Sequence, residues 1–375
     1  MIITISHLGY IKRTALTEFR SQNRGGVGSK GSDSRDEDFI EYIYPASMHN
    51  TMLFFTQKGK CYWLKVYDIP EGSKNSKGRA IQNMLNIDGS DKVNAFIRVK
   101  GLTDSEYINS HFLVFCTKNG VIKKTSLEAY SRPRQNGVNA ITIREDDQVI
   151  QVRLTNGNSE ILMANKNGRA IRFNESKVRE MGRTATGVRG MTLDDDGQDE
   201  VVGMICVNKE ENEHIMVVSQ QGYGKRTLLD EVDEEGKMLL DENGESIPVY
   251  RVTNRGGKGV KTMNITDKTG KLVTIKSVTD DDDLMIINKS GITIRLKIAN
   301  IRVMGRATQG VRLINLEKRN DEIASVCKVM SEQIEEIVEE STEEISETEI
   351  VNNSEITEVD TKEIAEDVSE NTTEE

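Results

Sequence analysis

The chain has few of the residues that define disulfide-bonded or metal-binding proteins. Its 375 residues include four cysteines, four histidines, four prolines and one tryptophan. The cysteines lie 55, 90 and 121 residues apart within apolar runs, and no pair has the spacing of a zinc or redox motif. We therefore expect no metal site, and we expect buried thiols at Cys61, Cys116, Cys206 and Cys327.

Long apolar segments are also missing. No run approaches the ~20 residues that a membrane-spanning helix needs. The opening segment, Met1-Ile2-Ile3-Thr4-Ile5, is too short for the apolar region of a signal peptide and has no basic flank. These absences predict a cytoplasmic protein with no membrane partner.

Catalytic signatures are absent as well. The sequence has no Ser-His-Asp set, Cys-His pair or carboxylate pair at a diagnostic spacing. Gly26-Val27-Gly28-Ser29-Lys30-Gly31 formally matches the dinucleotide-binding fingerprint G-x-G-x-x-G, but a polar stretch and another strand-like segment follow it where that fold needs a helix. We expect no catalytic residue, no cofactor and no small-molecule substrate.

Charge divides the chain into two parts. Residues 331–375 contain 18 acids and one lysine, a net charge of −17, whereas residues 1–330 contain 43 acids and 49 bases, a net charge of +6. The acidic segment has no aromatic residue and too few apolar ones to offset the entropy of ordering it. The sequence therefore predicts a mildly basic folded body and a disordered acidic tail.

The body consists of repeats. An apolar alternating run, a tight turn with glycine and a second alternating run recur six times, which predicts six β-hairpins. Because Asn and Gly both accept positive φ, we expect type I′ geometry at the Asn-Gly turns. The six turns are Leu8-Gly9, Lys58-Gly59, Asn119-Gly120, Asn167-Gly168, Gln221-Gly222 and Ser290-Gly291.

A second glycine corner follows each hairpin turn. The interval is 19 residues in four units and 17 in the third, but 37 in the fifth, from Gly222 to Gly259. The fifth unit therefore carries an insertion, which we place near Asp230–Tyr250 as an acidic surface hairpin. Six β-rich units of this size predict an all-β ring of four-stranded blades.

A glycine-rich basic loop occupies the first corner. Gln22-Asn23-Arg24-Gly25-Gly26-Val27-Gly28 has a second copy at Asn254-Arg255-Gly256-Gly257-Lys258-Gly259. So dense a set of glycines excludes a helix or strand interior and lets another backbone approach closely. We interpret both copies as phosphate-binding corners.

The second strand of every predicted hairpin carries bases. Strand alternation places Ile171 and Phe173 inward and Arg172 outward, and in the sixth unit it places Arg295 and Lys297 outward. If the units are blades, these bases form a band around the outer edge, which suits the repeating phosphates of duplex DNA. The alternative is that they only solubilise outward strand faces.

The order of these motifs resembles one known family. The resemblance lies in Gly9-Tyr10-Ile11-Lys12-Arg13-Thr14, the glycine loop, Asp36-Glu37-Asp38, Leu53-Phe54-Phe55-Thr56 and Tyr62-Trp63-Leu64-Lys65-Val66-Tyr67. In this order they are similar to the first two blades of the C-terminal domain of DNA gyrase A. The resemblance covers Met1 to about Val329.

That resemblance implies a six-bladed β-pinwheel, a propeller-like ring whose blades exchange strands, with DNA bent around its outer edge. Gln22–Gly28 would be the gyrase A box, although Asn23 and Val27 stand where the family has bases. The residues then expected to contact DNA are Lys12, Arg13, Gln22, Arg24, Gly25, Gly26, Gly28, Lys30, Arg35, Lys60, Lys65, Lys77, Arg79, Lys123, Lys124, Arg169, Arg172, Arg183, Lys225, Arg226, Arg255, Lys258, Arg295, Lys297 and Arg306.

The resemblance also implies partners and a division of labour. DNA cleavage belongs to an N-terminal breakage-reunion domain of gyrase A, and ATP hydrolysis, with its Mg²⁺, belongs to gyrase B. We therefore expect residues 1–330 to be a non-catalytic DNA-wrapping domain that works with both, giving the enzyme its negative supercoiling, and we expect the tail at 331–375 to be autoinhibitory. The alternatives are the equivalent domain of topoisomerase IV and a propeller scaffold for proteins with the tail as its adaptor.

Overall fold

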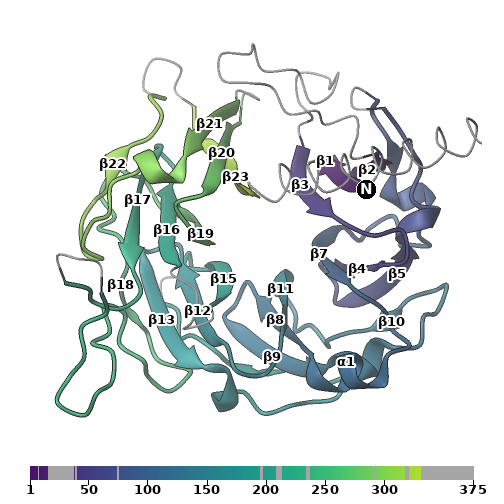
Figure 1. Cartoon of the computed structure of the whole chain (residues 1–375), viewed down its shortest axis with the longest axis horizontal. Helices are drawn as coiled ribbons and strands as arrows, with labels where there is room; N and C mark the ends of the chain where they lie inside the picture. The colour runs from purple at the N-terminus through teal and green to yellow at the C-terminus, as the bar shows by residue number, and fades with distance from the viewer. Residues whose placement is uncertain are drawn as a thin grey trace, which may run out of the picture.

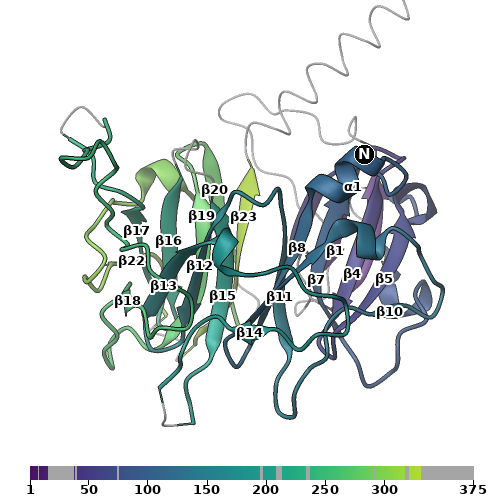
Figure 2. The same cartoon turned by 90° about the horizontal axis from the view of Figure 1, so that it is seen from below.

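The structure is an all-β ring of six blades around a central channel (Figure 1). It is a computed structural model that describes residues 1–6, 8–15, 38, 40–73, 76–194, 197–207, 213–233, 237–289, 293–316 and 321–330. The gyrase A box, with Lys30 and Arg35, and the tail at 331–375 lie outside the described residues. From the side, the strands run between the two faces of the ring (Figure 2).

All six predicted hairpins are present, and each forms the centre of a blade. The hairpins are β1 (Ile2–Ser6) with β2 (Tyr10–Thr14), β4 (Thr51–Thr56) with β5 (Lys60–Lys65), β8 (Phe112–Thr117) with β9 (Val121–Ser126), β12 (Glu160–Asn165) with β13 (Arg169–Asn174), β16 (His214–Ser219) with β17 (Tyr223–Leu228), and β20 (Asp282–Asn288) with β21 (Thr293–Lys297).

An inner strand pairs with the first strand of each hairpin and lines the channel. The inner strands are β3 (Ile40–Pro45), β7 (Val93–Val99), β11 (Val149–Thr155), β15 (Val201–Val207), β19 (Leu272–Val278) and β23 (Ile323–Met330). Strand β23 of the last blade contacts β3 of the first, so the two ends of the described fold meet at the channel.

The outer strand of each of the first five blades comes from the next repeat. After each of the second to sixth hairpins the chain returns to the preceding blade, adds a two-residue strand there and then continues to its own inner strand. The outer strands are β6 (Arg79–Ala80), β10 (Val138–Asn139), β14 (Val188–Arg189), β18 (Val260–Lys261) and β22 (Val311–Arg312). This arrangement confirms the exchange of strands between blades, and in the described residues the sixth sheet has three strands.

The corner glycines make this return possible. Gly78, Gly137, Gly187, Gly259 and Gly310 immediately precede the outer strands, and all have φ between 68° and 87°. At Gly259 a Cβ atom would lie 2.4 Å from the carbonyl oxygen of Ala170 on the preceding blade. Only glycine combines the left-handed φ with so close an approach of two backbones.

The hairpin turns differ from the type I′ geometry predicted at Asn-Gly. Gly120 has φ of 81°, but neither Asn119 nor Asn167 has positive φ, and the Gly120 amide donates to the Thr117 carbonyl at 3.1 Å. This is a type I turn followed by a left-handed glycine, the three-residue loop that forms a bulge. An acid from the following link stabilises it, since Asp147 accepts from the Asn119 amide at 2.9 Å.

Hydrophobic cores lie between blades, not within one. On β4, Leu53 and Phe55 pack with the third blade, whereas Met52 and Phe54 pack with the first. The period-2 alternation likewise divides β8, β12 and β16 between two cores, so neither face of these strands meets solvent. Cys61, Cys116 and Cys327 are buried and Cys206 is half-buried, and none of these four cysteines forms a disulfide.

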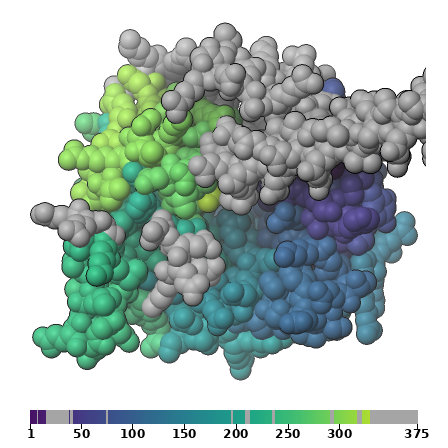
Figure 3. Space-filling model, viewed as in Figure 1, coloured from purple at the N-terminus to yellow at the C-terminus, as the bar shows by residue number. Residues whose placement is uncertain are grey.

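Two features lie outside the strands of the blades. The short helix α1 (Ser105–Ser110) begins at Asp104, whose carboxylate accepts from the amides of Glu106 and Tyr107. The segment between β17 and β18 projects from the edge of the ring (Figures 1 and 3). Its 230–250 part forms bridges at Val232 to Met238 and at Leu240 to Ser246, with residues 234–236 outside the described set.

Candidate nucleic-acid interface

The segments that lead to the outer strands cross the faces of the preceding blades. We call these segments straps; they are residues 66–78, 127–137, 175–187, 229–259 and 298–310. Four straps form a one-residue parallel bridge with a base on the hairpin of the preceding blade. The bridged pairs are Arg13 with Glu71, Lys124 with Glu180, Arg172 with Val252 and Arg226 with Val303. The straps therefore run directly over these hairpin bases.

Three hairpins carry two adjacent bases: Lys12 and Arg13, Lys123 and Lys124, and Lys225 and Arg226. The first base of each pair donates to two backbone carbonyls, at least one of them on a strap. The Nζ atom of Lys12 donates to the carbonyls of Ser73 and Ser76 at 3.0 and 2.7 Å. Lys123, fully buried, donates to Ala140 and Arg183 at 2.6 and 2.5 Å. Lys225 donates to Gly305 and Arg306 at 2.6 Å each. Burial lowers the pKa of both Lys123 and Lys225 to about 7.

The second base of each pair binds an acid, and the two arginines, Arg13 and Arg226, also donate to strap carbonyls. Lys124 lies 2.9 Å from Glu175, and Arg13 lies 3.1 Å from Glu71. Arg226 forms an ion pair with Asp280 and donates to the carbonyl of Ile301 at 2.5 Å.

Arg172 shows the same arrangement in its most buried form. Its side chain is 1% exposed, and it donates to Glu160 at 2.6 Å and to Asp230 at 2.7 Å. It also donates to the carbonyls of Leu229 and Tyr250.

The expectation that these bases point outward is therefore wrong. Neighbouring blades cover both faces of the middle strands and the straps cover their ends, so strand alternation does not lead to a solvent face. The bases that the structure places beneath straps are Lys12, Arg13, Lys123, Lys124, Arg172, Lys225 and Arg226. Their hydrogen bonds tie one blade to the strap of the next.

The other predicted residues are more accessible. Lys60 and Lys65 are half-buried, as are Arg183, Arg255 and Arg306. Lys77 is exposed and lies 4.1 Å from the centre of the Tyr10 ring. The remaining exposed bases of the predicted set are Arg79, Arg169, Lys258, Arg295 and Lys297, of which Arg295 forms an ion pair with Asp283.

The second copy of the glycine loop packs on the neighbouring strap. The guanidinium of Arg255 donates to the carbonyls of Lys177 and Arg189 at 3.1 and 3.0 Å. The Gly256 amide donates to Gly190 at 2.6 Å, and Lys258 remains exposed, 3.5 Å from Asp194. This loop thus joins two straps and presents one lysine to solvent.

The outer strands carry bases that strand alternation in the hairpins could not reveal. Four of the five described outer strands have one exposed base: Arg79, Arg189, Lys261 and Arg312. Each follows a corner glycine by one or two residues, so the repeat itself contains the signal. Exposed bases on the straps add to this band, namely Arg132, Arg134, Lys177, Arg179 and Arg302.

The described residues contain no cluster of histidine, cysteine, aspartate or glutamate side chains that could hold a metal ion. None of their helices is long and apolar enough to cross a membrane.

Comparison with solved structures supports the fold. The chain matches the C-terminal domain of DNA topoisomerase IV with a TM-score of 0.71 and 24% identity, over 92% of this chain and 97% of that one. It matches a DNA gyrase A C-terminal domain with a TM-score of 0.64 and 23% identity, over 87% and 98%. At these identities the matches establish the six-bladed ring alone.

Sequence comparison identifies the family. The chain is 39% identical over 336 residues to the DNA gyrase A protein of Staphylococcus aureus strain MRSA252, and 38% identical to that of strain NCTC 8325. These matches cover 90% of this chain but 35% of the relatives, so the chain spans about a third of their length. The family model for the DNA gyrase C-terminal domain, a beta-propeller, matches residues 1–47, 50–100, 111–156, 159–208, 213–236, 249–279 and 282–327, and the chain therefore belongs to this family.

Proposed function

We propose that the outer edge of the ring binds duplex DNA through its phosphates and bends it, without reading base sequence. The observation that carries the proposal is the exposed base on the outer strands of four blades: Arg189, Lys261 and Arg312 are the second residues of their strands, and Arg79 is the first residue of its strand. A duplex that follows the edge would meet a cation at each of these blades, and the straps that carry further exposed bases lead directly into these outer strands.

The energy of bending explains why the contacts must be distributed. Smooth bending of a 20–30 bp segment costs on the order of 1–6 kcal/mol, which no single surface cation offsets. Each phosphate contact displaces about one counterion, so the affinity should fall steeply as salt rises. Contacts spread over successive blades supply the attraction along the whole bent arc.

The test compares two four-residue variants. In the edge variant, Arg79, Arg189, Lys261 and Arg312 are changed to Gln. In the matched control, the exposed bases Lys92, Lys100, Arg144 and Lys268, which lie in the links before and after inner strands, are changed to Gln. Fluorescence anisotropy with a labelled duplex, measured over a range of salt, gives the affinity and its salt slope. We expect the edge variant to reduce the slope by up to about four, one for each contact, and the control to reduce it much less. Equal losses in both variants would refute an interface at the outer strands.

Within a complete gyrase, this bending would give strand passage its direction. The wrapped DNA would present a neighbouring segment to the breakage-reunion domain as a crossing of one sign, while gyrase B supplies ATP hydrolysis. Family membership and the 39% identity to a gyrase A protein support this role. The alternative stated from the sequence, the equivalent domain of topoisomerase IV, is tested in the same assay. Ligation of nicked circles on the protein should shift the linking number in the positive sense, and no shift would favour that alternative.

A further inference from the structure

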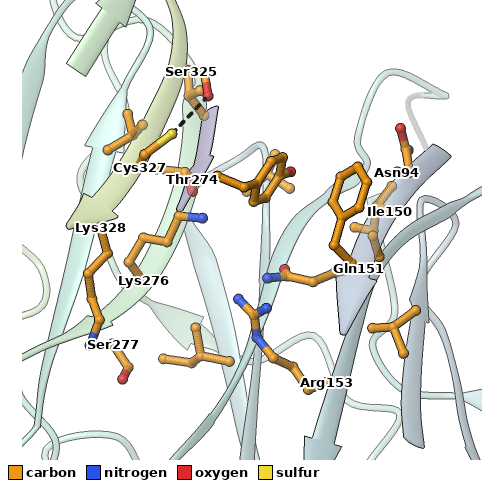
Figure 4. Close-up of a pocket in the computed structure, with 18 of the residues that line it drawn as sticks. Asn94, Ile150, Gln151, Arg153, Thr274, Lys276, Ser277, Ser325, Cys327 and Lys328 are labelled. Carbon is orange, nitrogen blue, oxygen red and sulfur yellow. Dashed lines mark hydrogen bonds between the residues drawn. The ribbon is translucent and has the colours of Figure 1, made fainter. Parts of the chain in front are cut away.

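The central channel of the ring forms a second candidate site, separate from the outer edge. A cavity of about 510 Å³ lies among the inner strands, and all six of them contribute residues to it. Figure 4 shows its polar lining, to which β11 contributes Gln151 and Arg153 and β19 contributes Lys276. The outer-edge proposal uses none of these residues.

The lining of the channel carries positive charge only. Arg153, Lys276 and Lys328 come from three different blades, and no described residue of the lining is acidic. Two acids lie behind the lining: Asp282 pairs with Lys328 at 3.1 Å, and Glu213 accepts from the hydroxyl of Ser277. Asp282 therefore offsets part of the charge of Lys328, and the lining as a whole keeps an excess of positive charge.

Arg153 is the most available of these groups. The described residues provide no hydrogen bond or ion pair to its guanidinium, although the side chain is half-buried. In Figure 4 it extends from β11 into the space between the strands, toward the wall that carries Lys276. Two cations that share a narrow, partly desolvated space repel each other unless an anion lies between them.

Gln151 adds a neutral donor to the same space. Its side-chain oxygen accepts from the Met204 amide at 2.8 Å, which fixes the orientation of the amide group. The NH₂ group is then directed away from β15 and toward the channel (Figure 4). The guanidinium and the amide on β11 and the ammonium on β19 bring hydrogen-bond donors of two blades to one space, which is the composition of an anion site.

The size of the cavity limits the ligand. A volume of about 510 Å³ lies within the range of roughly 300–1,000 Å³ typical of small-molecule sites, and it is far too small for a duplex. On the opposite side, Tyr42 packs against Phe96 with ring centroids 4.9 Å apart, which leaves an apolar wall. We propose that the central channel binds a small polyanion of the condensed-phosphate class, held by Arg153, Lys276 and the Gln151 amide.

Isothermal titration calorimetry of the full chain with inorganic tripolyphosphate tests this proposal. We expect saturable binding that is at least about tenfold weaker in the double variant Arg153→Gln/Lys276→Gln, since each charge-assisted hydrogen bond contributes more than a neutral one. The edge variant with Arg79, Arg189, Lys261 and Arg312 changed to Gln serves as the control. It should keep tripolyphosphate binding and lose DNA affinity, whereas the channel variant should show the reverse.

If the double variant does not fold, a second variant tests the same proposal. Gln151→Glu retains the shape of the side chain and the acceptor for Met204 but places a negative charge in the channel, so it should abolish tripolyphosphate binding. In the wild type the ligand should also raise the midpoint of thermal unfolding, because it binds only the folded ring. No binding to the wild type, or unchanged binding in folded channel variants, would overturn the proposal; because the DNA assay is separate, either result leaves the outer-edge proposal standing.

Discussion

The guanidinium of Arg172 donates to the carboxylate of Asp230 at 2.7 Å, across 58 residues of sequence. Asp230 opens the strap that carries the insertion of the fifth unit, and Arg172 belongs to the hairpin of the fourth blade. Glu160 on the adjacent strand accepts from the same guanidinium, so two acids share one buried cation. This network fixes the start of the strap against the blade that receives its outer strand.

Removal of Arg172 should destabilise the ring strongly. Arg172→Met leaves Glu160 and Asp230 buried without their cation, and breaking a buried ion pair in this way costs about 3–5 kcal/mol. Denaturant unfolding gives the free energy of unfolding directly. The control is Arg169→Met on the same strand, where the side chain is exposed and the loss should stay within about 0.5 kcal/mol. Equal losses at the two positions would contradict a structural role for Arg172.

The buried lysines predict a dependence of stability on pH. Burial lowers the pKa of Lys123 and Lys225 from 10.5 to about 7. Between these values the unfolded chain holds protons that the folded ring does not, so the free energy of unfolding should rise as the pH increases from about 7 toward 10. Burial and Arg226 lower the pKa of His214 below its usual value, so His214 does not contribute to the change between pH 7 and pH 10.

Denaturant unfolding at several pH values measures this effect. The variant Lys123→Gln/Lys225→Gln should lose the part of the rise that these two amines contribute. A rise of the same size in wild type and variant would show that other groups are responsible.

The corner glycines should not tolerate a side chain. Gly259→Ala combines a φ of 74° with a Cβ atom 2.4 Å from the Ala170 carbonyl oxygen, so it should destabilise the ring by at least about 2 kcal/mol. Gly182→Ala is the matched control, because no atom lies within 4 Å of its added Cβ and its φ is not left-handed. There the lower entropy of the unfolded chain should make the change neutral or stabilising by up to about 1 kcal/mol. Thermal unfolding distinguishes the two results.

The glycine-rich loop at 22–28 should control wrapping more than binding. Arg24→Ala should weaken wrapping in part, and Arg24→Ala/Lys30→Ala should abolish the positive linking-number shift on nicked circles, because the loop then has no base between Gln22 and Lys30. Affinity for a short linear duplex should change far less, since the bases of the other blades remain. A full shift with the double variant would show that this loop does not organise the wrap.

The acidic tail should reduce the affinity for DNA. Residues 331–375 carry a net charge of −17, which competes with phosphate for the basic edge. A chain that ends at Met330 should bind a duplex more tightly than the full chain, and the difference should shrink as salt rises. Equal affinities at low salt would rule out autoinhibition.

The sequence predicted the blades better than it predicted which bases are exposed. Turn glycines and alternating strands are local signals, and they predicted all six hairpins. The period-2 rule assumes that one face of a strand meets solvent, and this failed for Arg172 because neighbouring blades cover both faces of β13. Nothing in the local sequence shows that Gly187 and Arg189 belong to the sheet of the preceding blade.

The exposed bases of the outer strands could also have been found from the sequence, but by a different route. Arg189 and Arg312 occupy matching positions two residues after the corner glycines Gly187 and Gly310. Their exposure follows from the topology, since β14 and β22 are the outermost strands of their sheets. An alignment of the repeats, together with the knowledge that strands are exchanged between blades, would have identified these two arginines. The alternation of the hairpin strands identified instead the cations that lie beneath the straps.

The return of each chain segment to the preceding blade also determines how such a ring can gain or lose blades. A deletion from the first to the last strand of one sheet, such as β4 to β10, would also remove the next hairpin and the edge strand β6 of the preceding sheet, and would leave the inner strand β11 without a hairpin. A deletion from one hairpin turn to the next removes two hairpin strands, one edge strand and one inner strand, and every remaining sheet stays complete. The repeating unit of the sequence is therefore offset from the visible blade, and a blade can be removed with all other sheets complete only as one whole repeat.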